Sequence, residues 1–188
     1  MIAILDRQHL GKPSKPGDHG AVHGALRETD LTDAYIAAAA DALRRHGHTV
    51  EVLVEGEYGT RHHRAREIAR GAPKTRCAYV ACHVNAGGGT YGLVEYDARS
   101  TRGAQLADEL AHGLRALPGV TTSRTKGLGA GERGWVCIDG IYAGPANLAG
   151  VIFEPGFIDA GGHAGLWTAE GLTRIGTALA LACEGWAA

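Results

Sequence analysis

Short apolar runs alternate with amphipathic stretches along most of the chain. An uninterrupted apolar run of about four to eight residues is typical of a buried strand, whereas apolar residues that recur every three or four positions are typical of a helix packed on a core. Because strands and helices alternate, we expect an α/β fold of three layers, with a mainly parallel twisted sheet and helices on both faces. The patterns predict strands at 2–6, 49–55, 77–83, 91–97 and 150–157, and helices at 28–47, 60–71, 100–117 and 169–185.

Two stretches lack this periodicity and should form loops. Residues 7–27 are rich in Gly, Pro and His, and residues 119–147 are rich in Gly. Within the second stretch, WVCI at 135–138 is a candidate short strand. No linker or internal repeat is visible, so we expect a single domain over residues 1–188.

Two of the expected helices carry end signals. Thr29 or Asp30 is the candidate N-cap of the first helix, and Gly47 is its expected end. Ser100 is the expected N-cap of the third helix.

Charge and hydropathy narrow the classes of partner. The formal net charge is -1, and no basic surplus of the kind that nucleic-acid binders carry is present. No apolar run approaches the roughly 20 residues needed to cross a bilayer, and no basic run would hold the chain on a membrane surface. We therefore expect no nucleic-acid partner and no membrane partner. We also expect a monomer.

The start of the chain and its cysteines bear on the compartment. MIAILDRQH has neither the basic segment nor the apolar stretch of a secretory signal, so we expect cytoplasmic synthesis. Cys77, Cys82, Cys137 and Cys183 are sparse and lack zinc-finger spacing. We expect them to be free and buried, which suits a reducing compartment.

Four polar residues follow or precede the expected strands and helices at one end of the sheet. His9 follows the first strand, Glu28 begins the first helix, and His83 and Glu154 each end a strand. In open α/β sheets, ligands bind at the carboxyl ends of the strands. Two imidazoles and a carboxylate suit a catalytic zinc ion that keeps one position for water, and a further carboxylate could act as a general base.

Taken singly, these residues have simpler interpretations. A buried histidine at a strand end, such as His83, is more often only hydrogen-bonded than metal-bound. Glu154 is harder to explain in this way, because it directly follows the apolar residues 151–153. A buried carboxylate without a partner there would cost several kcal/mol.

Six stretches, in this order, resemble the zinc-dependent N-acetylmuramoyl-L-alanine amidases of the amidase-3 type, and the resemblance covers nearly the whole chain. The last two are the more specific, matching the S-x-H-x-N-A and E-x-G-F-I motifs of that family. The stretches read ILDRQHLG, HGALRETDLTDAY, LRRHGHTVEVL, RHHRAREIA, ACHVNA and EPGFID.

The resemblance implies an enzyme and assigns its residues. It implies zinc ligands at His9, Glu28 and His83, with Glu154 as the catalytic carboxylate and Asn85 as an outer or loop-shaping residue. The expected substrate is peptidoglycan, cleaved between N-acetylmuramic acid and the L-alanine of the stem peptide. A phage endolysin, which reaches the cell wall after release from the cytoplasm, or a bacterial autolysin without its signal would both fit.

The chain departs from the family at two places. The family has a tight G-H-G-G turn after the first strand, whereas this chain has RQHLGKPSKPGDHG. Ala81 and Cys82 stand where the family commonly has Ser and an aliphatic residue. Both departures concern loop geometry more than the ligand set.

The remaining histidines are weaker candidates. His19 and His23 have the i, i+4 spacing of a helical metal pair, but their setting, GDHGAVHG, is too rich in Gly for a helix. The others are expected on solvated surfaces or helix ends: His46, His48, His62, His63, His112 and His163. Among the aromatic residues, Trp135 is the best candidate for contact with the substrate.

Two other classes of function stay open at this stage. One is a zinc amidohydrolase that acts on small N-acyl amino acids or peptides, which hydrolysis of soluble substrates without lysis would favour. The other is a non-catalytic wall-binding module with a decayed site, against which the presence of all four polar residues argues.

Overall fold

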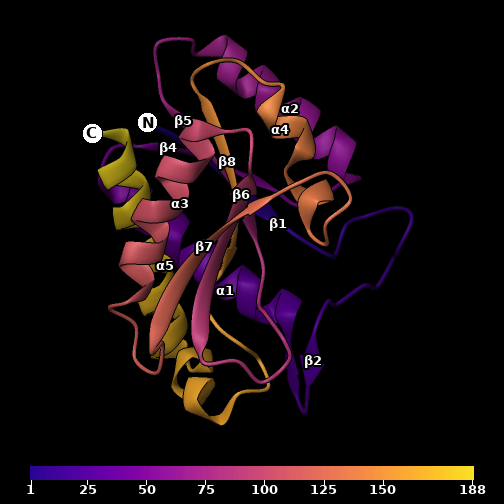
Figure 1. Cartoon of the computed structure of the whole chain (residues 1–188), viewed down its shortest axis with the longest axis vertical. Coiled ribbons are helices and arrows are strands. Elements are labelled where there is room, and N and C mark those ends of the chain that lie inside the picture. Colours follow the sequence, from indigo (N-terminus) through magenta and orange to yellow (C-terminus); the bar gives the residue numbers. More distant parts are fainter.

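The computed structural model describes residues 1–188 and contains a six-stranded sheet between two layers of helices (Figure 1). Strands β1, β4, β5 and β8 are parallel, whereas β6 runs antiparallel to β8 and parallel to β7. The predicted mainly parallel α/β fold is thus confirmed. In sheet order the strands are β4 (Thr49–Leu53), β1 (Ile2–Arg7), β5 (Cys77–Cys82), β8 (Leu148–Glu154), β6 (Tyr91–Asp97) and β7 (Thr122–Leu128).

The helices are divided unequally between the two faces. Helix α5 (Ala169–Ala187) packs against both α1 (Glu28–Arg45) and α3 (Thr101–Leu114) on one face, over the larger apolar cluster. Helices α2 (Tyr58–Gly71) and α4 (Asp139–Tyr142) cover the other face over a smaller cluster. Both faces of the central strands are therefore buried, which explains why the sequence of β5 is an uninterrupted apolar run.

All four cysteines are free and buried, as predicted. Alternation along β5 sends Cys82 into the larger cluster and Cys77 into the smaller one. Each thiol therefore replaces a small apolar side chain in one of the two cores.

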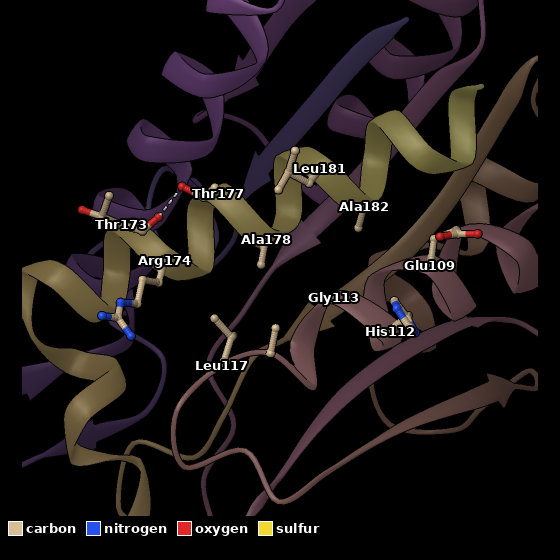
Figure 2. A pocket seen from close by; sticks show the side chains of 11 residues that line it. Glu109, His112, Gly113, Leu117, Thr173, Arg174, Thr177, Ala178, Leu181 and Ala182 are labelled. Carbon is tan, nitrogen blue, oxygen red and sulfur yellow. Dashed lines mark hydrogen bonds between the residues drawn. The ribbon is translucent and has the colours of Figure 1, made fainter.

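Helices α3 and α5 approach closely along their outer side (Figure 2). A Cβ atom on Gly113 would lie 3.3 Å from the carbonyl oxygen of Ala178, so a larger side chain there would push the helices apart. Together with Leu181 and Ala182, these residues line a shallow apolar groove of about 430 Å³.

The two expected loops contain more structure than the sequence pattern indicates. Residues 7–27 include a small hairpin, β2 (Val22–His23) with β3 (Leu26–Arg27). Residues 119–147 include the edge strand β7, and the expected strand at 135–138 is wrong: Trp135–Cys137 form a 3₁₀ helix, η1. A second 3₁₀ helix, η2 (Gly161–Trp167), precedes α5.

The expected N-cap of α1 is also wrong. The helix begins at Glu28 and Arg27 is its N-cap, without a side-chain hydrogen bond. Thr29 lies inside the helix, fully buried, and its hydroxyl contacts His19. Ser100 does cap α3, because its hydroxyl oxygen accepts a hydrogen bond of 2.9 Å from the N–H of Gly103.

A buried ion pair fixes the end of β1. The guanidinium of Arg61, from α2, donates to the Asp6 carboxylate at 2.7 Å, and both side chains are fully buried. Arg61 also donates to the carbonyl oxygens of Arg7 and Leu10, on either side of His9. Tyr79 donates its hydroxyl hydrogen to the other Asp6 oxygen.

We expect Arg61→Met to lower the free energy of unfolding by about 3–5 kcal/mol, because it leaves the Asp6 carboxylate buried without its counter-ion. Urea denaturation of the metal-free protein measures this change. Arg64→Met, on the exposed side of the same helix, is the control and should change it by less than about 0.5 kcal/mol. Equal stabilities of the two variants would contradict the role given to the pair.

Candidate metal and catalytic site

Three adjacent strands bring the candidate residues together. Strands β1, β5 and β8 are neighbours and parallel, so their carboxyl ends meet at one edge of the sheet. His9 lies two residues beyond β1, His83 directly follows β5, and Glu154 is the last residue of β8. Glu28 arrives from the side, as the first residue of α1.

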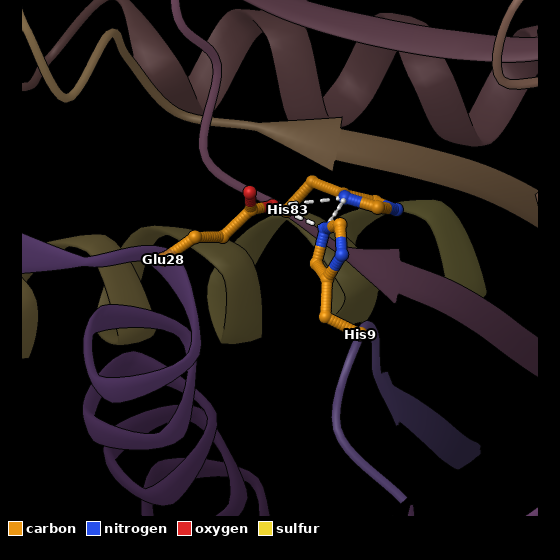
Figure 3. A group of neighbouring side chains, drawn as sticks. All are labelled: His9, Glu28 and His83. Atoms are coloured by element: carbon orange, nitrogen blue, oxygen red, sulfur yellow. Dashed lines mark hydrogen bonds and ion pairs between the residues drawn. The ribbon is translucent and has the colours of Figure 1, made fainter. Parts of the chain in front are cut away.

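His9, Glu28 and His83 point toward one another, with one donor atom from each at a common centre (Figure 3). Glu28 Oε1 lies 2.9 Å from His83 Nδ1 and 3.1 Å from His9 Nε2. The two imidazole nitrogens are 3.3 Å apart. The structure therefore brings together the three residues that the sequence analysis expected to be ligands, in a group that could hold a metal ion.

Backbone groups hold the Glu28 carboxylate in place. Its Oε1 accepts a hydrogen bond of 2.9 Å from the N–H of Val84, and its Oε2 accepts one of 2.7 Å from the N–H of Ala21. Burial alone would raise the pKa of the Glu28 carboxyl, but hydrogen bonds and charge from His83 and His9 outweigh it and hold the pKa far below its ordinary value. Glu28 is therefore ionised, as a metal ligand must be.

The turn around His9 depends on tight backbone geometry. His9 itself has a φ of 67°, which is uncommon for a residue other than glycine. Gly20, with the same φ value, passes so close that a Cβ atom there would lie 2.3 Å from Glu28 Oε2 and 2.7 Å from the His9 ring. Only glycine can occupy this position while the two side chains stay where they are.

Glu154 lies in the same cleft, which has a volume of about 630 Å³ and is also lined by His9, Glu28 and His83. Asn85 Nδ2 donates a hydrogen bond of 2.6 Å to Glu154 Oε2. Burial, together with the negative charges of Glu95 and Glu28, raises the pKa of the Glu154 carboxyl to about 8. A carboxyl group with a pKa near neutrality can both accept and release a proton at physiological pH.

Two further residues touch the imidazoles and were not among the site residues expected from the sequence. Asp18 Oδ2 lies 3.2 Å from His9 Nδ1, and Cys137 Sγ lies 3.7 Å from His83 Nε2. Both come from the irregular regions of the chain, where periodicity carries no information about which side chains face the sheet. The one sequence signal for these two contacts is Asp18 itself, a carboxylate next to a histidine in the stretch GDHG.

The other histidines lie outside the cluster. His19 contacts Thr29, and His23 is exposed in the hairpin. The expectation of a solvated position is wrong for His62 and His163, which are both buried. Hydrogen bonds to the backbone make these buried positions possible. His62 Nε2 donates a hydrogen bond to the carbonyl oxygen of Cys137, and His163 Nδ1 accepts one from the N–H of Phe157.

Comparison with known proteins identifies the fold. No protein-family profile and no curated protein sequence matches the chain. The N-acetylmuramoyl-L-alanine amidase AmiC2 of Nostoc punctiforme superposes with a TM-score of 0.74 at 19% identity, over 99% of this chain and 96% of that one. The catalytic domain of the CD27L endolysin, which targets Clostridia difficile, gives 0.62 at 20% identity, over 96% and 97%.

A third structure is similar over only part of its length. Cwp6 from Clostridium difficile gives a TM-score of 0.73 at 19% identity, and this chain spans 29% of that protein. At these identities the likeness establishes the three-layer α/β fold.

None of the helices is both long enough and apolar enough to pass through a membrane.

Proposed function

We propose that this protein is a zinc-dependent peptidoglycan amidase, which hydrolyses the amide between N-acetylmuramic acid and the L-alanine of the stem peptide. The observation that carries the proposal is the meeting of His9, Glu28 and His83 in one cleft with Glu154. The similarity of the fold to solved amidases, one of them an endolysin domain, supports the choice of substrate. We also propose a role in cell lysis, which the endolysin domain among these structures supports.

The three donor atoms suit zinc. In a tetrahedral site with ligand distances of about 2.1 Å, the ligand atoms lie about 3.4 Å from one another. The separations in the cluster are 2.9, 3.1 and 3.3 Å, so small side-chain adjustments would place all three atoms around one ion. Two imidazoles and one carboxylate favour zinc over magnesium or calcium, which prefer oxygen ligands only.

Zinc at this site would supply a water molecule of lowered pKa and would polarise the carbonyl of the scissile amide. The chain's own acid–base group is Glu154. It would accept the proton of the attacking water and then pass it to the departing alanine nitrogen, which is otherwise a poor leaving group. Asn85 holds the Glu154 carboxylate at the cleft while this proton moves.

The two other classes of function are less well supported. A decayed wall-binding module would not need the half-buried Glu154 carboxylate beside an intact group of three potential ligands, because burying charge is costly. A zinc amidohydrolase for small N-acyl amino acids or peptides would use the same residues. It would hydrolyse soluble substrates and leave intact peptidoglycan uncut.

We expect removal of the metal to stop hydrolysis without unfolding the protein. Neither apolar core contains His9, Glu28 or His83, so we expect zinc to add binding free energy to a preformed site. A chelator should abolish the release of soluble fragments from purified sacculi and lower the melting temperature, with the helical circular dichroism largely unchanged. Added zinc should restore activity, whereas wholesale unfolding on chelation would mean that the metal is structural.

A further inference from the structure

The loop after β1 carries a second layer of charge behind His9. His9 has two ring nitrogens with different surroundings: Nε2 faces Glu28 and His83, and Nδ1 faces Asp18 Oδ2 at 3.2 Å. A neutral imidazole that binds a metal through Nε2 must carry its proton on Nδ1. An acceptor at Nδ1 therefore selects the tautomer that a ligand needs.

The Asp18 carboxylate is itself held from two sides. Its Oδ1 accepts a hydrogen bond of 3.0 Å from the N–H of Gly20, and its Oδ2 lies 3.3 Å from the ammonium of Lys12. Lys12 is only 6% exposed, which is rare for lysine, and its ammonium also lies 3.3 Å from the Tyr58 hydroxyl. The buried ammonium of Lys12 and the N–H of Gly20 thus hold the carboxylate beside His9 Nδ1.

Both charged residues belong to the stretch in which this chain departs from the tight turn of the amidases that it resembles. The loop between His9 and Asp18 closes on itself, because the His9 ring contacts the Asp18 carboxylate. This stretch therefore gives the site a carboxylate–histidine contact, with the buried Lys12 against the same carboxylate. This inference rests on the proposed function, because it takes His9 as a zinc ligand.

We propose that Asp18 is the positioning residue of His9. Its carboxylate accepts a hydrogen bond from the Nδ1–H group and so fixes the tautomer and ring orientation in which Nε2 faces Glu28 and His83. Lys12 holds the carboxylate in this place. Of the three proposed ligands, Asp18 contacts only His9. Loss of an outer carboxylate of this kind costs roughly 10–100-fold in metal affinity.

The test is the zinc affinity of Asp18→Ala, measured by competition with a chromophoric chelator and without any substrate. We expect zinc to bind about 10–100-fold more weakly than in the parent. Asp159→Ala is the matched control, because Asp159 also accepts glycine N–H groups in a loop, those of Gly87 and Gly88, but contacts none of the three ligands. Its zinc affinity should equal that of the parent.

A second measurement separates positioning from a general structural role. In the zinc-loaded parent labelled with ¹⁵N-histidine, the Nδ1 hydrogen of His9 should give a slowly exchanging downfield resonance. That resonance should disappear or exchange rapidly in Asp18→Ala and stay in Asp159→Ala. If Asp18→Ala does not fold, Asp18→Asn is used, and we expect the resonance to shift upfield because a neutral amide is a weaker acceptor.

Zinc affinity and a His9 resonance equal to those of the parent would overturn the proposal for Asp18, even if the parent cleaves peptidoglycan. A parent that binds zinc but does not cleave peptidoglycan would overturn the amidase proposal, while the loss of affinity in Asp18→Ala would still support the role of Asp18. The two failures are thus distinguishable.

Discussion

His83→Ala should lose most of its zinc and all measurable hydrolysis. In the proposed site the imidazole is one of three protein ligands, and its removal leaves only His9 and Glu28 to hold the ion. The substitution removes a side chain that belongs to neither apolar core, and the hydrogen bond from the Tyr35 hydroxyl to the His83 carbonyl oxygen stays. The fold should therefore survive, and elemental analysis after gel filtration measures the metal.

The matched control is His63→Ala. His63 lies on the exposed side of α2, with its side chain 60% exposed, and pairs only with Glu67 on the same helix. This variant should keep about one zinc ion per chain and the activity of the parent. Full zinc occupancy in His83→Ala would remove His83 from the metal site.

Glu154→Gln should keep zinc and lose turnover by about 100-fold or more, the usual scale for loss of general acid–base catalysis. Glutamine has the same size, and its carbonyl oxygen can still accept the hydrogen bond from Asn85. It cannot accept a proton from water at neutral pH. Turnover on sacculi and zinc content, measured on the same preparation, separate the two effects.

The outcome of this substitution assigns the two carboxylates. Glu170→Gln, at an exposed position at the start of α5, is the control and should match the parent in both measurements. If Glu154→Gln loses zinc, Glu154 is a ligand and Glu28 becomes the candidate base. If it stays fully active, Glu154 has no part in the reaction.

The sequence predicted the central strands well because both of their faces are buried. The apolar runs at β1, β5 and β8 mark these strands directly, and the polar residue after each run marks its carboxyl end. The meeting of His9, His83 and Glu154 follows from these positions and from the adjacency of the strands. Glu28 reaches the cluster from the start of a helix, and no strand pattern marks it. Its prediction as a ligand came from the resemblance to the amidases.

Strand β7 escaped prediction for the opposite reason. It lies at the edge of the sheet and is mostly exposed, so TSRTKGL lacks an apolar pattern. Its neighbour β6 runs antiparallel to β5 and β8, and the sequence contains a signal for this direction. No helix separates the expected strands at 77–83 and 91–97, and strands that run in the same direction need a long crossover connection between them. The outer residue Asp18 could not be found from periodicity, because its position depends on the path of an irregular loop.

Digestion of purified sacculi, with the new ends identified by mass spectrometry, tests the central claim most directly. The account predicts that the zinc-loaded protein releases stem peptides with a free L-alanine amino terminus and leaves glycan strands whose muramic acid lactyl groups end in free carboxylates. The Glu154→Gln variant should release neither. New ends within the peptide or within the glycan, or intact sacculi beside hydrolysis of a small N-acyl amino acid, would contradict the account.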